Sequence, residues 1–152
     1  MSRFRFNKML EKMSALKREL PIELGNMGQR FFVDAFRKEG WTDRGFIKWA
    51  PRKDKSNLRP LLIGKSGGTK NAAHIHLRQS VNTSLKKSTW DEILFMAPQK
   101  YAAIHNEGGE GLAFGKYKFT MPQRKFMGNS HVLIGNMSKR VNLRMNQVLK
   151  AR

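Results

Sequence analysis

The chain has 152 residues, a length that fits one ordinary domain and lets folding bury roughly two-thirds of the unfolded chain's surface. Its hydrophobic fraction of 39% excludes wholesale disorder, and the absence of cysteine excludes disulfides, thiolate metal sites and cysteine nucleophiles. Thirty Lys and Arg against eleven Asp and Glu give a formal net charge of +19, which indicates a partner such as DNA, RNA, an anionic membrane or an acidic protein surface.

No apolar run approaches the ~18 residues that a membrane span needs. Residues 2–5 lead into an amphipathic pattern instead of the continuous apolar region of a signal peptide. We therefore expect a soluble protein with no membrane partner and a single domain over residues 1–152.

Residues 1–40 predict two helices. Apolar residues recur at spacings of three and four over residues 6–20, and Pro21 is expected to end this first helix. A second helical pattern covers residues 24–36, and Gly40 is its natural stop.

Residues 41–70 predict an extended, partly mobile loop, because Pro and Gly interrupt this basic segment repeatedly. Loops of this length inside compact domains are usually functional or ordered by a partner. Trp41 and Trp49 are expected to hold its start against the core, and residues 61–63 are expected to form a short strand.

Two further strands are expected next. The alternation of Ile75, Leu77 and Val81 indicates one, and the apolar run at residues 93–96 indicates another. Pro98 then suits the first turn of a short helix that ends at Gly108 and Gly109.

Residues 116–121 alternate cleanly between apolar and polar side chains, which predicts a strand that Pro122 stops. Residues 133–149 carry an apolar stripe at mostly four-residue spacing, which predicts a C-terminal helix with Ser138 as an alternative N-cap. Together these elements predict an α+β fold with N-terminal helices, a small, mainly antiparallel β-sheet, and a C-terminal helix packed on the sheet.

The residues offer little to catalysis or cofactor binding. The run at residues 64–70 is similar to a phosphate-binding P-loop, but Arg59 stands where that motif needs Gly. His74 and His76 would share one strand face, yet no paired carboxylates or HExxH spacing accompany them. We expect no enzyme activity, metal, cofactor or small-molecule substrate.

A basic loop at about residues 50–73 is the densest candidate for contact with a polyanion or a protein partner. Any nucleic-acid binding there would be non-specific and steeply salt-dependent, because the spacing matches no named nucleic-acid module. A solvated or protein-facing loop is the alternative. The residues concerned are Arg52, Lys53, Lys55, Arg59, Lys65 and Lys70.

Two segments carry a family resemblance: residues 101–109 (YAAIHNEGG) and residues 119–128 (FTMPQRKFMG). With the upstream landmarks at residues 49–51, 62–67 and 77–81, they resemble the phage virion morphogenesis family, which includes tail completion proteins. The motif positions are Trp49, Pro51, Tyr101, His105, Gly108, Gly109, Pro122, Arg124, Phe126 and Gly128.

The resemblance implies a structural protein of the virion that completes the tail or neck and supports head–tail joining. The implied partners are further copies in a homo-oligomeric ring, connector or neck proteins, tail-tube proteins, and the DNA passing the junction. The implied location is the head–tail junction or tail end, with assembly in the host cytoplasm. A basic nucleic-acid-binding protein without an assembly role is the alternative.

The motif residues also have physical interpretations of their own. Gly108 and Gly109 permit positive φ after the short helix, and Phe126 is expected to be a core anchor. Arg124 is expected to reach an acidic neighbour or carbonyls at a subunit boundary. Maintenance of the fold and direct ring contacts are both open roles for these residues.

Overall fold

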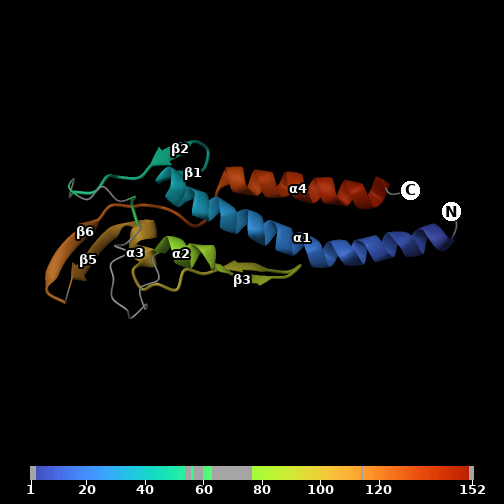
Figure 1. Ribbon diagram of the computed structural model, residues 1–152, viewed down its shortest axis with the longest axis horizontal. Coiled ribbons are helices and arrows are strands. Elements are labelled where there is room, and N and C mark those ends of the chain that lie inside the picture. The colour runs from blue at the N-terminus through green and yellow to red at the C-terminus, as the bar shows by residue number, and fades with distance from the viewer. Residues whose placement is uncertain (1–2, 54–55, 57–59, 63–76, 114, 151–152) are drawn as a thin grey trace.

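The computed structural model describes residues 3–53, 56, 60–62, 77–113 and 115–150 (Figure 1). A 36-residue helix, α1 (Arg3–Lys38), runs through the molecule, and α4 (His131–Lys150) lies antiparallel beside its middle part. The short helices α2 (Leu77–Asn82) and α3 (Ala102–Glu107) and three β-hairpins lie around the rest of α1.

Each hairpin is a two-stranded antiparallel sheet. Trp41 faces Ile47 in the first, and Gly111 faces Phe119 in the third. The predicted α+β class is confirmed, with the strands divided among separate hairpins. These pair β1 (Gly40–Thr42) with β2 (Phe46–Lys48), β3 (Leu85–Ser88) with β4 (Ile93–Phe95), and β5 (Gly109–Ala113) with β6 (Tyr117–Met121).

The prediction of two N-terminal helices separated at Pro21 is wrong, because Pro21 lies inside α1. An interior proline removes one backbone hydrogen bond and costs about 3 kcal/mol. One hydrophobic cluster spans both sides of this proline. It contains Leu16 and Leu20 before Pro21, Leu24 after it, and Val148 of α4, and this burial keeps the helix continuous. Figure 1 shows that α1 bends partway along, as proline-containing helices do.

Two predicted strands are also wrong where the structure describes them. Leu77 and Val81 belong to α2, where a spacing of four places both on one buried face. Leu61 and Leu62 form a turn, and Leu62 has a φ of 58° that no strand residue adopts. Residues 63 and 75 lie outside the described residues.

The predicted loop at residues 41–70 begins with a hairpin, β1–β2, that the sequence analysis missed. Trp41 and Trp49 are buried, which confirms that they hold this segment against the core. The strands at residues 93–96 and 116–121, the short helix before Gly108 and the C-terminal helix are confirmed as β4, β6, α3 and α4.

The main core joins aromatic side chains from distant segments. The ring of Phe36 lies 5.5 Å from that of Trp49 and 5.2 Å from that of Phe126, and Phe32 meets Phe95 edge to face at 5.0 Å. α4 contributes Leu133 to this core and then continues along α1. Among the described helices, none combines the length and apolar character that a membrane crossing requires.

Candidate functional site

Arg124 lies at the centre of the motif residues. The residue is only 7% exposed, and its guanidinium donates from Nε to the carbonyl of Ala50 at 3.0 Å and from Nη2 to the carbonyl of Pro51 at 3.2 Å. No carboxylate in the described chain forms a salt bridge with it. Burial, together with the nearby charge of Arg52, lowers the pKa of Arg124. The expected contact with carbonyls is made within the chain.

Trp49 and Phe126 act together with Arg124, and we call the contacts of these three residues the clamp. Trp49 donates from Nε1 to the carbonyl of Lys125 at 2.8 Å, so together with the two bonds of Arg124 three hydrogen bonds join the segment after β2 to the segment after β6. Phe126 is 1% exposed, which confirms it as a core anchor. These long-range bonds fix where both segments leave the core.

Asn106 was missed as a site residue by the sequence analysis. Its Oδ1 accepts the backbone N–H groups of Phe126 at 2.9 Å and Met127 at 3.0 Å, and the neighbouring carbonyl of His105 accepts the N–H of Arg124 at 2.8 Å. An amide two residues before a glycine pair at a helix end was the available signal, because such residues often satisfy loop backbone groups.

Gly108 and Gly109 follow directly after the last residue of α3. Gly108 has a φ of 73° and Gly109 a φ of 119°, which confirms the expected positive φ at both. A Cβ on Gly108 would lie 2.8 Å from the backbone nitrogen of Gln123. Glycine at this position therefore lets β5 start close against the segment that follows Pro122.

His105 faces both the core and Tyr101. The two rings meet edge to face at 5.8 Å, and Tyr101 remains 44% exposed. Partial burial, reinforced by the charge of Arg124, lowers the pKa of His105. The motif residues thus form a structural clamp, and among the described residues no set of histidine and acidic side chains is placed to hold a metal.

Only part of the predicted basic loop can be placed. Arg52 donates to the carbonyl of Pro60 at 2.5 Å, and Lys53 is exposed. Nearby, Leu61 donates its N–H to Glu39 Oε1 at 2.6 Å. Lys55, Arg59, Lys65 and Lys70, like His74 and His76, lie outside the described residues, so contact with a polyanion remains a prediction.

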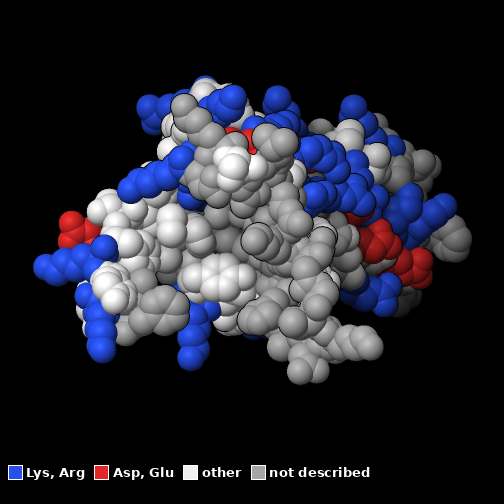
Figure 2. Space-filling model, turned by 60° about the vertical axis from the view of Figure 1, so that its left-hand side comes forward, with Lys and Arg blue, Asp and Glu red and all other residues white. Residues whose placement is uncertain are grey.

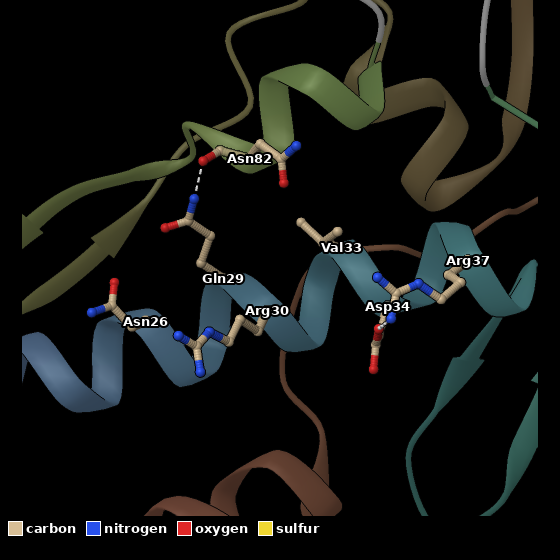
Figure 3. Close-up of a pocket in the computed structure, with 7 residues that line it drawn as sticks. All are labelled: Asn26, Gln29, Arg30, Val33, Asp34, Arg37 and Asn82. Atoms are coloured by element: carbon tan, nitrogen blue, oxygen red, sulfur yellow. Dashed lines mark hydrogen bonds and ion pairs between the residues drawn. The ribbon is translucent and has the colours of Figure 1, made fainter.

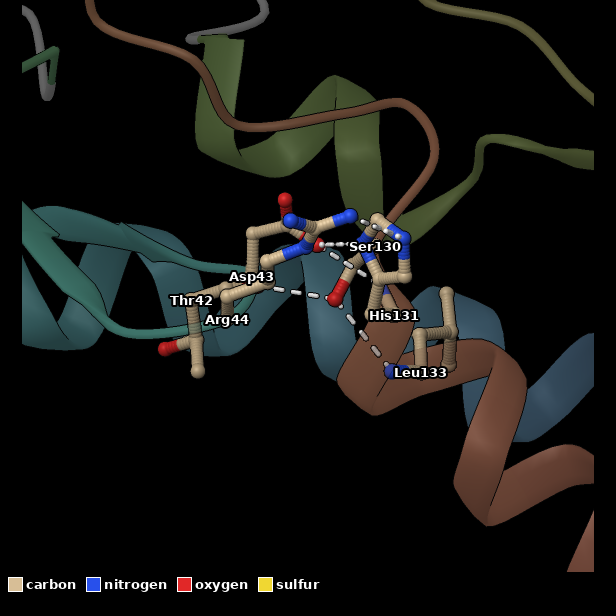
Figure 4. Close-up of polar contacts among 6 residues, drawn as sticks. All are labelled: Thr42, Asp43, Arg44, Ser130, His131 and Leu133. Carbon is tan, nitrogen blue, oxygen red and sulfur yellow. Dashed lines mark hydrogen bonds and ion pairs between the residues drawn. The ribbon is translucent and has the colours of Figure 1, made fainter.

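A polar cluster joins the β1–β2 turn to the start of α4 (Figure 4). Asp43 accepts the backbone N–H of His131 at 2.6 Å and lies 2.9 Å from its Nδ1, and Ser130 Oγ donates to the carbonyl of Thr42 at 2.8 Å. These bonds from His131 lower the pKa of Asp43. Ser130 also accepts the N–H of Leu133, so it is the N-cap and the predicted alternative, Ser138, is wrong.

A polar hollow of about 490 Å³ lies between α1 and the end of α2 (Figure 3). Gln29 points across it and donates to the carbonyl of Asn82, while Arg37 pairs with Asp34 at 3.2 Å. The hollow is open, and three of its lining side chains, Gln29, Asp34 and Arg37, are engaged within the chain. It joins two helices and offers no reactive group.

The surface charge is strongly asymmetric in sign. Lys and Arg spread over the face in Figure 2, and the acidic side chains form small groups among them. Several acids are paired within the chain: Glu23 with Arg140 at 2.7 Å, and Glu92 with Lys87 at 2.7 Å. Each such pair neutralises one cation as well as one acid, and the cations in excess of the acids give the chain its net charge of +19.

The model of the phage virion morphogenesis family matches residues 5–141. That range includes every motif residue, nearly all of α1 and about half of α4. No curated protein and no solved structure matches the chain.

Proposed function

The chain belongs to the phage virion morphogenesis family, and from this premise we propose that it completes the tail or neck of a phage and supports head–tail joining through ring-forming contacts between copies. Family membership makes it a structural or assembly protein associated with the phage particle. The family match over residues 5–141 is the observation that carries the proposal. In this role the protein is not an enzyme.

The exposed surface supports a role in assembly. Phe46 and Ile47 on β2, and Leu112 and Tyr117 on the β5–β6 hairpin, are large apolar side chains that lie open to solvent. Each strand of a two-stranded sheet also has an unpaired edge, which can pair with another chain. Closed association of identical copies would cover both features.

The proposed partners follow from this role. Copies of the chain form the ring, connector or neck proteins and tail-tube proteins meet its faces, and the cationic surface faces acidic partners or the DNA that passes the junction. The proposed location is the head–tail junction or the tail end, reached after assembly in the host cytoplasm.

Loss of the protein from an infection provides the direct test. We expect filled heads and tails to accumulate without joining, and expression of the intact chain to restore joined particles in electron micrographs. The purified protein should form a defined oligomer by native mass measurement. A monomer at all concentrations, even with tail components added, would contradict the proposal.

The charge of +19 favours one second candidate, a nucleic-acid-binding protein without an assembly role. Such binding neutralises phosphates and releases counterions, so affinity falls steeply as salt rises. A mobility-shift titration of DNA and RNA across salt concentrations tests it. Absence of binding at low salt rules out this candidate and leaves the assembly role in place.

A further inference from the structure

The N-terminal end of α1 extends beyond the end of α4 (Figure 1). Leu16 packs against Val148, close to the last residue of α4. In the preceding turns Phe6, Met9 and Leu10 are exposed, Phe6 by 57%. Their spacing of three and four places them on one helix face, so this end carries an apolar stripe that the described part of the chain leaves open.

An apolar groove of about 430 Å³ lies elsewhere on the same molecule, between the middle of α1, the β3–β4 turn and α4. Trp90, which lines the groove, is 50% exposed, an unusual degree of exposure for the largest apolar side chain. The apolar lining consists of Leu20, Pro21, Leu24, Trp90, Ile93 and Val141.

The charges around the stripe and the groove are opposite in sign. Asp91 and Glu92 line the groove of this basic protein, and Glu92 is paired with Lys87. Residues 3–12, which carry the stripe, include two arginines, two lysines and one glutamate. Two such helix ends would repel each other, whereas the groove attracts them.

A single copy cannot fill its own groove. Phe6 and Leu20 belong to one continuous helix, and 14 residues of helix separate them by about 21 Å. A second apolar groove beside Phe126 is lined by both Glu107 and Lys125, so charge does not favour a cationic occupant there.

We propose that the groove beside Trp90 receives the N-terminal end of α1 from a second copy of the chain. This inference rests on the proposed ring-forming function and names the two surfaces that meet. The surfaces differ, so the contact is head to tail, the kind that closes into a ring when the rotation between copies permits. The apolar stripe and Trp90 are buried together, and the cationic flank of the helix lies against Asp91.

Cysteine cross-linking tests the pairing, because the native chain contains no cysteine. Asn7→Cys places a thiol beside Phe6, and Thr89→Cys places one at the groove, while both apolar contact residues are retained. We expect an oxidised mixture of the two variants to form at least about tenfold more disulfide-linked dimer than Asn7→Cys mixed with Arg37→Cys, whose exposed site lines the polar hollow towards the C-terminal end of α1. Equal yields, or equal cross-linking of Asn7→Cys to itself, would overturn the proposal.

Tryptophan fluorescence provides a second measurement in the unmodified protein. Trp41 and Trp49 are already buried, so a blue shift on self-association reports Trp90. We expect the shift to be lost in Trp90→Phe. Asp91→Lys should weaken self-association about tenfold, and Asp34→Lys, which changes an acid of the polar hollow outside the groove, should leave it unchanged.

The two proposals fail in different ways. A defined oligomer that shows neither the selective cross-link nor the Trp90 shift contradicts the groove contact and leaves the assembly function standing. Failure of the intact chain to restore joined particles contradicts the assembly function, whatever the cross-linking shows.

Discussion

The guanidinium of Arg124 donates to the backbone carbonyl of Ala50 at 3.0 Å, although 74 residues separate the two along the chain. The adjacent carbonyl of Pro51 accepts a second bond from the same group. A buried cation that is held by carbonyls depends on each of them, because a lost bond leaves a desolvated charge or acceptor. Arg124 therefore connects the two halves of the motif.

Arg124→Ala should lower the free energy of unfolding by about 2–4 kcal/mol, because two buried carbonyls lose their donor and the guanidinium leaves a void. Arg124→Lys should cost about 1–2 kcal/mol, since an ammonium lacks the planar fork that reaches both carbonyls. Urea unfolding followed by circular dichroism measures both. An Arg124→Ala midpoint equal to that of the parent would show that the clamp does not stabilise the fold.

Asn106→Ala should destabilise the protein by about 2 kcal/mol, because the N–H groups of Phe126 and Met127 both lose their acceptor. Asn106→Asp retains an oxygen at this position and is the matched control. Its urea midpoint should lie closer to that of the parent. If the two variants have the same urea midpoint, the side-chain oxygen of Asn106 does not stabilise the segment at Phe126 and Met127.

Gly108→Ala should cost about 1–3 kcal/mol, because its φ of 73° and the nearby nitrogen of Gln123 leave no strain-free place for a methyl group. Gly135→Ala is the control: it lies in α4 with nothing near the new Cβ, and should raise stability by about 0.5–1 kcal/mol. Thermal unfolding of the two variants should therefore shift in opposite directions. A stabilised Gly108→Ala would contradict the strain argument.

His105 should make stability pH-dependent. Its folded pKa lies below the usual value of 6.5, so between these two pKa values the unfolded chain binds more protons than the folded one. Stability from this group is complete above pH 6.5 and falls as the pH drops towards the folded pKa. Thermal melts from pH 5 to pH 8 should show this loss in the parent, and His105→Gln should show a smaller one.

Sequence reasoning succeeded where a local pattern decides the structure. The four-residue spacing of α4, the alternation of β6 and the glycine pair after α3 all act over a few residues. Trp49 and Phe126 were also identified as buried, because large aromatic side chains rarely find another way to leave water.

The predictions fail where contacts between residues far apart in the sequence decide the structure. Pro21 normally ends a helix, but packing of Leu16, Leu20 and Leu24 with Val148 of α4 keeps α1 continuous. The bonds from Asn106 to Phe126 and from Asp43 to His131 span 20 and 88 residues, and no local pattern identifies such partners. The groove beside Trp90 likewise exists only once α1, α4 and the β3–β4 turn have come together.

The pairing of α1 with α4 has a consequence during synthesis. About 90 residues separate the end of α1 from the start of α4, so at translation rates of roughly 5–20 residues per second the ribosome needs about 5–18 s to make the intervening chain. Throughout that interval Leu16 and Leu20 lack the helix that covers them. On a polysome, neighbouring nascent chains present the same uncovered helix at high local concentration, so the intact fold must compete with premature helix pairing until α4 emerges.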